Sequence, residues 1–200
     1  MEQSALNSFE RLLLPDAEVW YAPAFFSPEE SAAFLTELQK DITWKQENIK
    51  LFGKEHPMPR LTAWYGDRSY TYSGLVNDPQ PWIPALLAIR QKITTATGKN
   101  FNSVLLNLYR SGQDSMGWHA DDEPELGPEP CIASVSFGAE RRFGFRHRYN
   151  KELENKYITL QNGSVLLMQG PTQHYWQHGL PKTTKAGSMR INLTFRNIVS

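Results

Sequence analysis

The spacing of hydrophobic and polar positions predicts two helices in the first hundred residues and short strands after them. The first helix is expected to begin at Ser27 and to end near residue 40. Ser27 is a favourable N-cap, Pro28 suits the first helical position, and Glu30 completes a capping box. Residues 1–15, before this helix, are expected to form a loosely held leader.

Two segments lie between the predicted helices. Residues 44–65 read as strands around a turn, with Leu51-Phe52-Gly53-Lys54 at its tip. Residues 66–80 are rich in Tyr, Gly and Asp and are expected to form a loop. The second helix is predicted to begin near Trp82 and to stop at Gly98, because glycine commonly follows the last helical turn.

The remaining apolar segments are short, as is typical of strands. They comprise residues 19–21, 101–109, 131–138, 142–148, 156–160, 164–169 and 189–199. Two helices followed by many short strands predict a mainly β fold, a β-sandwich or jelly roll with N-terminal helices, of the α+β class. Its length suits one domain over residues 1–200, divided into an N-terminal extension (16–100) and a strand-rich core (101–200).

Composition narrows the possible functions only slightly. With 21 basic and 21 acidic residues the formal net charge is zero, so a nucleic-acid partner would have to be recognised through local patches. No apolar run reaches the length of a bilayer span, and a signal-peptide pattern is absent from the sequence, so no membrane association is expected. Cys131 is the single cysteine; its apolar surroundings predict a buried, inert thiol and exclude an intramolecular disulfide.

A candidate metal site lies in the stretch Met116–Glu123. In an extended segment His119 and Asp121 project to the same side and can offer one nitrogen and one oxygen to one metal. His178 would complete the two-histidine, one-carboxylate set of non-haem Fe(II) oxygenases. His174 is the alternative third ligand, whereas the charged and polar surroundings of the other two histidines, His56 and His147, argue against metal binding.

The last predicted strand strengthens this hypothesis. Between Arg190 and Arg196 polar residues (Arg190, Asn192, Thr194 and Arg196) alternate strictly with apolar ones, so four polar groups share a face. The alternative is an edge strand with one solvated face. Two arginines beside a metal instead favour a carboxylate ligand such as 2-oxoglutarate, with Asn107 and Tyr109 adding hydrogen bonds.

Together these motifs resemble the AlkB family of Fe(II)/2-oxoglutarate-dependent dioxygenases. The resemblance rests on Asn107-x-Tyr109, His119-x-Asp121, His178 and Arg190-x-Asn192-x-Thr194-x-Arg196, and extends over about residues 57–199. It implies a double-stranded β-helix (jelly-roll) dioxygenase core. It also implies Fe(II) held by His119, Asp121 and His178, with 2-oxoglutarate bound by Asn107, Tyr109, Arg190, Asn192, Thr194 and Arg196.

The implied reaction is oxidative repair of an alkylated base. Decarboxylation of 2-oxoglutarate to succinate would use O2 to hydroxylate an N-alkyl group of 1-methyladenine or 3-methylcytosine type, with release of formaldehyde. Within the family the sequence is most similar to the branch that acts on duplex DNA. The resemblance further implies a monomer, with a nucleotide-recognition lid in residues 16–100.

Substrate contacts are assigned by the same resemblance. Phe52, with Gly53 and Lys54, would form an intercalating finger, and Tyr70 and Tyr72 would sandwich the flipped base together with the His119 ring. The further assignments are Asp122 and Glu123 as readers of the base, and Arg142, Arg146 and Arg148, with Arg141 nearby, as phosphate contacts.

Alternatives to a duplex-DNA enzyme are kept open. The loop at 181–186 lacks the consecutive basic cluster of the duplex-acting branch, which leaves single-stranded DNA or RNA as possible substrates. A non-catalytic jelly-roll binding module is the alternative from another class. A bacterial cytoplasm is expected, or a nucleus if the host is eukaryotic.

Overall fold

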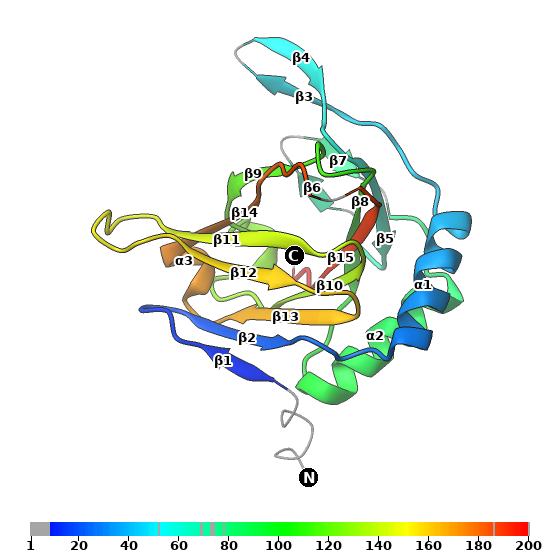
Figure 1. Ribbon diagram of the computed structural model, residues 1–200, viewed down its shortest axis with the longest axis horizontal. Coiled ribbons are helices and arrows are strands. Elements are labelled where there is room, and N and C mark those ends of the chain that lie inside the picture. The colour runs from blue at the N-terminus through cyan, green and yellow to red at the C-terminus, as the bar shows by residue number, and fades with distance from the viewer. Residues whose placement is uncertain are drawn as a thin grey trace.

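Two β-sheets packed face to face and two helices form the body of the molecule (Figure 1). The structure, a computed structural model, describes residues 9–51, 53–68, 70–72, 75–77, 79–185 and 187–199, with the side chains of residues 50, 51, 70–72 and 75–77 left out. The larger sheet contains, in spatial order, β1 (Glu10–Leu12), β2 (Glu18–Ala22), β13 (Ser164–Gln169), β10 (Ile132–Gly138), β15 (Arg190–Arg196), β8 (Ser103–Tyr109) and β5 (Leu61–Gly66). The smaller sheet contains β12 (Lys156–Leu160), β11 (Arg141–His147), β14 (Trp176–Leu180) and β9 (Met116–His119).

Helices α1 (Pro28–Asp41) and α2 (Pro84–Thr97) cover the outer face of the larger sheet. Both predicted helices are confirmed. Ser27 caps α1 in the predicted capping box with Glu30, and Gly98 ends α2 in a left-handed conformation at φ 66°. The second helix begins at Pro84 rather than at Trp82, because a proline disfavours helical geometry in the residue before it.

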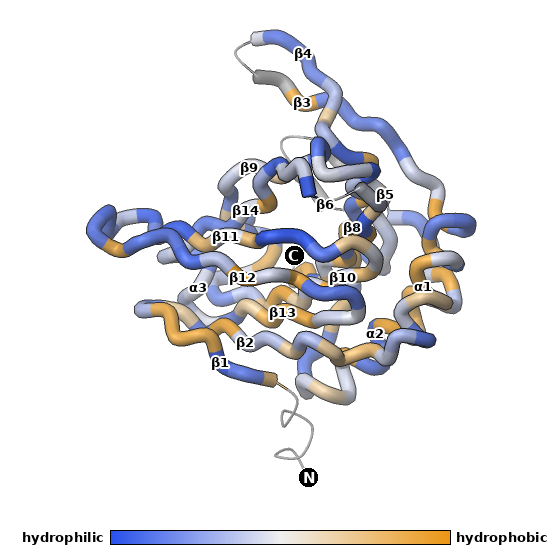
Figure 2. The backbone as a smooth tube through the Cα atoms, in the orientation of Figure 1, coloured by the Kyte–Doolittle hydropathy of each residue, from blue (hydrophilic) through white to orange (hydrophobic). Residues whose placement is uncertain are grey.

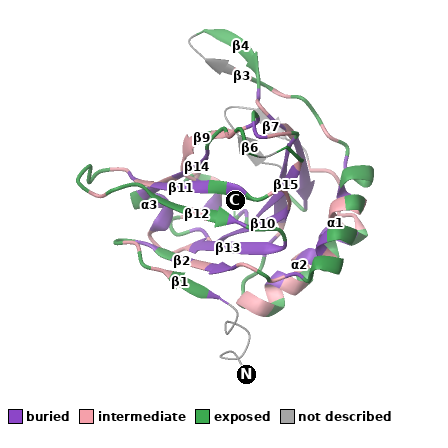
Figure 3. Cartoon of the chain, viewed as in Figure 1, coloured by how far each residue is buried: buried purple, intermediate pink, exposed green. Residues whose placement is uncertain are grey.

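Two hydrophobic clusters follow from this layering. One lies between the helices and the larger sheet and includes Leu86, Ile89, Val104 and Phe195. The other fills the space between the two sheets, around Trp176, and contains aromatic side chains from both. Figure 2 shows the corresponding hydrophobic colouring of β10 and β13, and Figure 3 shows both strands buried. The mainly β jelly-roll fold with N-terminal helices is therefore confirmed.

Two hairpins extend from the body. The first consists of β3 (Asn48–Leu51) and β4 (Lys54–Pro57) and stands clear of both sheets, with β4 exposed along its length (Figures 1 and 3). The predicted strands around a turn are thus confirmed here. The second hairpin pairs β6 (Tyr70–Tyr72) with β7 (Leu75–Asn77), where the sequence predicted a loop. Tyrosine, threonine and valine favour extended backbone, and this preference prevailed over the turn-forming residues between them.

Part of the segment expected to be a loosely held leader is a strand. Residues 10–12 form β1 and pair with β2, with Arg11 opposite Trp20, so this part of residues 1–15 belongs to the larger sheet. The Arg11 guanidinium lies 5.8 Å from the Trp20 ring. Among the described residues, no helix is long and apolar enough to cross a membrane.

Cys131 is half-buried just before β10. Burial raises the pKa of its thiol to about 11. The group therefore stays protonated at neutral pH, in keeping with the inert thiol that the sequence predicts.

Candidate active site

The three predicted metal ligands converge at the edge of the smaller sheet. His119 on β9 lies directly opposite His178 on β14 in the antiparallel register, and a register shift follows between His178 and Leu180. Asp121 comes two residues after His119, just beyond the end of β9. His174, the alternative ligand, is exposed on the short helix α3 (Thr172–Tyr175), outside this cluster.

Distances within the cluster are suitable for a single metal ion. One ligand atom from each of His119, Asp121 and His178 lies within 4.8 Å of the other two. His119 Nε2 is 4.0 Å from Asp121 Oδ1, and His178 Nε2 is 3.8 Å from Asp121 Oδ2. The donor set of two imidazoles and one carboxylate fits Fe(II) and leaves positions for other ligands.

His119 presents Nε2 in the form that binds a metal, and His178 is neutral. The carbonyl of Gly117 can only accept, so the 2.9 Å contact to His119 Nδ1 places the proton on Nδ1 and the lone pair on Nε2. His178 stacks on Phe143 at 5.5 Å between ring centroids. Burial and the neighbouring His119 lower the pKa of His178 to about 3, so the His178 ring is neutral.

Asp121 is held ionised by a buried arginine. Its Oδ1 accepts a hydrogen bond of 2.6 Å from Arg196 Nη2, and both side chains are only 1% exposed. Burial alone would raise the pKa of Asp121, but neighbouring positive charge, chiefly that of the hydrogen-bonded Arg196, outweighs that effect and leaves this pKa below its ordinary value. Arg196 thus orients a predicted metal ligand, in addition to facing the predicted 2-oxoglutarate pocket.

Gln173 is a site residue that sequence reasoning missed. Its Oε1 accepts the backbone N–H of Asp121 at 2.9 Å, and its side chain is buried in α3. This bond connects α3 with the segment carrying Asp121, and makes Gln173 a positioning residue for that carboxylate. The only signal in the sequence is a polar residue close to His178, which is too weak to identify a partner 52 positions away.

We expect Gln173→Met to weaken metal binding by about 10-fold, as is typical of lost hydrogen bonds around a metal ligand. The substitution retains side-chain length but leaves the buried Asp121 N–H without its acceptor. Co(II) titration followed by absorption spectroscopy measures the affinity. Gln177→Met is the matched control, because Gln177 bonds Arg146 on the outer face of the sheet; equal affinities of the two variants would contradict the role of Gln173.

The even-numbered residues of β15 face the cluster, as predicted. Arg190, Asn192, Thr194 and Arg196 line one cavity together with Asn107, Tyr109 and the three candidate ligands. The odd-numbered residues, such as Leu193, pack in the cluster beneath the helices. β15 lies between β10 and β8 in the centre of the larger sheet, so the alternative of an edge strand is wrong.

Arg190 is a buried cation that has no carboxylate partner among the described residues. Its side chain is fully buried, its guanidinium lies 5.3 Å from the Tyr109 ring, and burial lowers the pKa of Arg190 to about 10. Its Nη2 donates to Ser136 Oγ at 3.0 Å, whereas its Nε has no hydrogen-bond partner. Within the described part of the chain no carboxylate forms an ion pair with it, so a ligand carboxylate fits this position.

Two serines on β10 hold the polar residues of β15 and were also missed; of the two, Ser134 lines the cavity. Ser136 orients Arg190, and Ser134 Oγ accepts from Asn192 Nδ2 at 2.8 Å. The register of β10 against β15 creates both contacts. Asn107 lines the same cavity and accepts from Arg60 Nε at 2.8 Å.

Only some of the residues predicted to contact the substrate lie in the part of the chain that the structure describes. Gly53 and Lys54 lie at the turn of the β3–β4 hairpin, and Lys54 is exposed. Phe52 lies outside the described residues. Tyr70 and Tyr72 belong to β6, but their side chains also lie outside the description.

One of the residues predicted to recognise the base is paired with one of the predicted phosphate contacts. Arg148 donates to Asp122 at 2.6 Å, which occupies both as an ion pair, and Arg148 lies beyond the end of β11. Neither Asp122 nor Glu123 lines the metal cavity. Arg141 is buried and donates to three backbone carbonyls, so it is unsuited to a phosphate contact. These findings argue against Arg141 and Arg148 as phosphate contacts and against Asp122 as a free acceptor.

Comparisons with known proteins agree with this site. Residues 18–196 match the model of the 2OG-Fe(II) oxygenase superfamily. The chain is 43% identical over 190 residues to the bovine (Bos taurus) alpha-ketoglutarate-dependent dioxygenase alkB homolog 3, covering 91% of this chain and 66% of that protein. It is 43% identical over 185 residues to the human (Homo sapiens) DNA oxidative demethylase ALKBH2, covering 87% of this chain and 71% of that protein.

The chain spans a little less than two thirds of the alkB homolog 3 proteins that it matches, 66% and 64% for the bovine and mouse (Mus musculus) proteins. A solved structure of OsALKBH1 has the same fold, with a TM-score of 0.67 at 15% identity over 94% of this chain and 99% of that one. Family membership implies Fe(II), 2-oxoglutarate and O2 as cofactors. The chain belongs to the 2OG-Fe(II) oxygenase superfamily and, within it, to the AlkB family.

Proposed function

We propose that this protein oxidatively demethylates N-alkylated bases in DNA, of the 1-methyladenine or 3-methylcytosine type, while converting 2-oxoglutarate to succinate. The observation that carries the proposal is the placement of His119, Asp121 and His178 beside the buried, carboxylate-free Arg190. One end of a 2-oxo diacid then reaches the metal and the other reaches a guanidinium. The similarity to the human DNA oxidative demethylase ALKBH2 supports DNA as the substrate.

Each residue has a definite task in this reaction. His119, His178 and Asp121 would hold Fe(II), and Arg196 keeps the Asp121 carboxylate ionised and oriented. Arg190, oriented by Ser136, binds the distal carboxylate of 2-oxoglutarate. Bound Fe(II), 2-oxoglutarate and O2 supply the oxidation that hydroxylates the N-methyl group, after which formaldehyde leaves the base.

Apolar side chains exclude water around the reacting groups. Leu105 on the larger sheet and Met116, Phe143 and Leu180 on the smaller sheet are the apolar residues that line the cavity beside its polar groups. A dry, shaped cavity strengthens the interactions of the charged groups and protects the oxidation from side reactions. The protein thereby contributes orientation and shelter, and the cofactors contribute reactivity.

We propose duplex DNA as the strand form and the β3–β4 hairpin as the element that opens it. The hairpin stands clear of the sheets in Figure 1, and its β4 strand is exposed. The sequence puts Phe52 between Leu51 and Gly53 at the turn. An aromatic wedge at such a tip can fill the gap that a flipped base leaves in the stack.

Lesion-resolved mass spectrometry tests the proposed reaction. The protein is incubated with Fe(II), ascorbate and 2-oxoglutarate, and with one methylated sequence as duplex DNA, single-stranded DNA or RNA. Loss of the methyl group with equimolar succinate is expected, and it is expected to be fastest on the duplex. Succinate without demethylation of any strand would exclude a nucleic-acid substrate. Faster demethylation of RNA than of DNA would identify RNA as the preferred substrate.

We expect Phe52→Ala to slow duplex repair about 10-fold or more, because base–aromatic stacking contributes about 1–3 kcal/mol. Single-stranded repair should change less than about twofold, since no gap in a stack needs to be filled. The measurement is the initial rate on both strand forms. Leu13→Ala, which truncates a side chain that is 87% exposed between β1 and β2, is the control; equal losses on both forms would argue against a wedge.

A further inference from the structure

The outer face of the smaller sheet carries two arginines stacked on two aromatic rings. This face is the side of β12, β11 and β14 turned away from the metal cavity. Arg142 and Arg146 project from it on β11, Tyr157 lies on β12, and Trp118 on β9. We call the surface formed by Trp118, Arg142, Gly144, Arg146 and Tyr157 the outer track.

One end of the outer track is a tight arginine–tyrosine stack. The Arg142 guanidinium lies 3.5 Å from the centroid of the Tyr157 ring. Both residues are exposed, Tyr157 by 39%. The pair therefore presents a flat, cationic surface to solvent that is already desolvated on one side.

In the middle of the outer track Gly144 leaves the sheet without a side chain. A Cβ on Gly144 would lie 2.6 Å from the Trp118 ring and 2.8 Å from the Tyr157 ring, so both rings lie close against the bare backbone. Gly144 is directly opposite Tyr157 across the β11–β12 pair. Its missing side chain lets the two rings approach one another over the sheet.

The other end adjoins the active site. Arg146 lies 4.9 Å from the Trp118 ring and is held by Gln177 Oε1 at 2.7 Å. Trp118 and Gln177 immediately precede His119 and His178 on their strands, so they project from the opposite face of the sheet. The outer track thus begins one sheet thickness from the candidate metal site.

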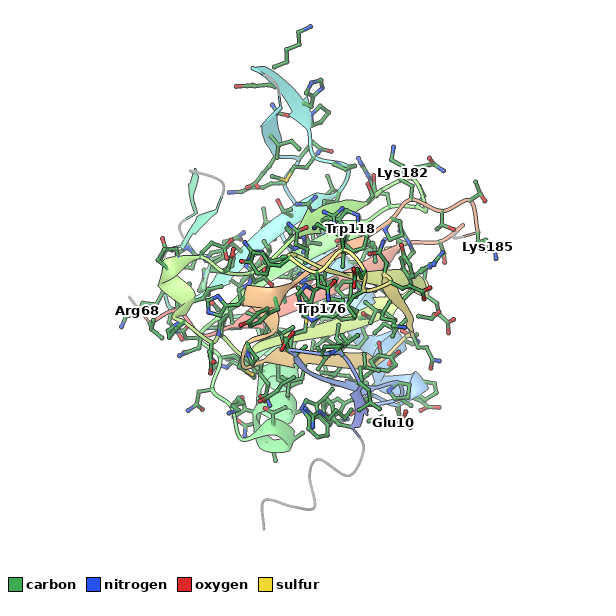
Figure 4. The ribbon with its side chains drawn as sticks, turned by 90° about the vertical axis from the view of Figure 1, so that its left-hand side faces the viewer. Glu10, Arg68, Trp118, Trp176, Lys182 and Lys185 are labelled. Carbon is green, nitrogen blue, oxygen red and sulfur yellow. The ribbon has the colours of Figure 1, made fainter. Side chains whose placement is uncertain are left out.

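A groove continues the outer track beyond Arg142. It has a volume of about 820 Å³ and is lined by Arg142, Tyr157, Lys182, Lys185 and, as its acidic member, Glu140. Figure 4 shows Lys182 and Lys185 on the loop before β15, at the upper right and right of the view. Basic groups therefore predominate from β9 to this loop, although the whole chain has a net charge of zero.

We propose that the outer track binds an unpaired nucleic-acid strand next to the nucleotide held in the active site. This inference rests on the proposed nucleic-acid substrate. Bases stack on the Arg142–Tyr157 pair and on Trp118, while Arg142, Arg146 and the lysines of the groove meet the phosphates. Alternating flat and cationic groups are what single-strand binding requires.

This arrangement favours a single strand over the other anionic partners. A duplex keeps its bases stacked inside and offers phosphates only, so it cannot use the flat surfaces. An acidic protein segment would use the charges and leave the rings without a function. The outer track is then the single-strand counterpart of the hairpin proposed for duplex DNA.

The test compares affinities, which require no turnover. Fluorescence anisotropy measures binding of unmodified 15-nucleotide single strands, a 15-base-pair duplex and a trinucleotide. We expect Tyr157→Leu to weaken binding of the long single strand about 5- to 20-fold, and Tyr157→Phe, which keeps the ring, to restore it. Arg142→Ala should lower the slope of log affinity against log salt by about 0.7, the value for one lost phosphate contact. Trinucleotide and duplex binding should change less than about twofold.

Arg90→Ala is the matched control, because Arg90 also stacks on an aromatic ring, 4.3 Å from the centroid of Trp82, but belongs to α2 and not to the smaller sheet. Long-strand affinities of Tyr157→Leu and Arg142→Ala equal to that of Arg90→Ala would overturn the proposal. So would competition by polyaspartate that matches competition by an unlabelled single strand. A wild-type protein that binds the strand through these residues but demethylates no lesion would refute the proposed function alone.

Discussion

Asp121→Asn should bind no metal and should release succinate at least about 1,000-fold more slowly than the wild type, because the metal supplies the reactivity of the site. The amide retains the size of the carboxylate and can still accept the hydrogen bond from Arg196. It lacks the negative charge that would bind Fe(II) between His119 and His178. Metal content by mass spectrometry and succinate release by chromatography measure the two effects.

Asp121→Ala separates metal binding from folding at the same position. It removes the carboxylate that neutralises the fully buried Arg196, and breaking such a pair costs about 3–5 kcal/mol. The free energy of unfolding should therefore fall in Asp121→Ala much more than in Asp121→Asn, while both lose the metal. Normal metal content in Asp121→Asn would exclude Asp121 as a ligand.

Arg190→Met should raise the KM for 2-oxoglutarate about 30-fold or more. Removing one partner of a buried, hydrogen-bonded charge pair costs about 2–5 kcal/mol, which corresponds to that range. Metal affinity should remain close to wild type, because Arg190 contacts Ser136 and Tyr109 and not the candidate ligands. Steady-state kinetics over a range of 2-oxoglutarate concentrations gives the KM.

Two further measurements make the Arg190 prediction specific. A 2-oxo monocarboxylic acid lacks the distal carboxylate, so wild-type protein should use it poorly and Arg190→Met should no longer discriminate against it. The variant without cofactors should also unfold at a higher temperature, since a buried cation without a carboxylate is replaced by an apolar side chain. Retained discrimination would place the distal carboxylate elsewhere.

Local signals made parts of the fold predictable. Ser27, Pro28 and Glu30 act within one helical turn, so their effect on α1 depends little on the rest of the chain. The alternation in β15 likewise needs only its own seven residues to define two faces. What these residues could not show is that both faces are buried, because that depends on the helices on one side and the second sheet on the other.

Long-range pairing accounts for the elements that were missed. β14 carries His178, yet its sequence, Trp-Gln-His-Gly-Leu, has no clear alternation, and pairing with β11 and β9 makes it a strand. β1 is likewise extended because β2 is next to it. For the same reason the partners of Gln173, Ser134 and Ser136 follow from the register between distant segments, which no local pattern encodes.

The two proposed anchoring points of 2-oxoglutarate belong to different sheets. His119 and His178 are carried by the smaller sheet, whereas Arg190 is carried by the larger one. A diacid held at both ends in the proposed way would span the space between the two sheets, so the distance between the sheets would set the length of the acid that fits. Aromatic packing around Trp176 fills the space between the sheets, so under this proposal the hydrophobic interior would contribute, with the charged groups, to the choice of a five-carbon acid over its shorter and longer homologues.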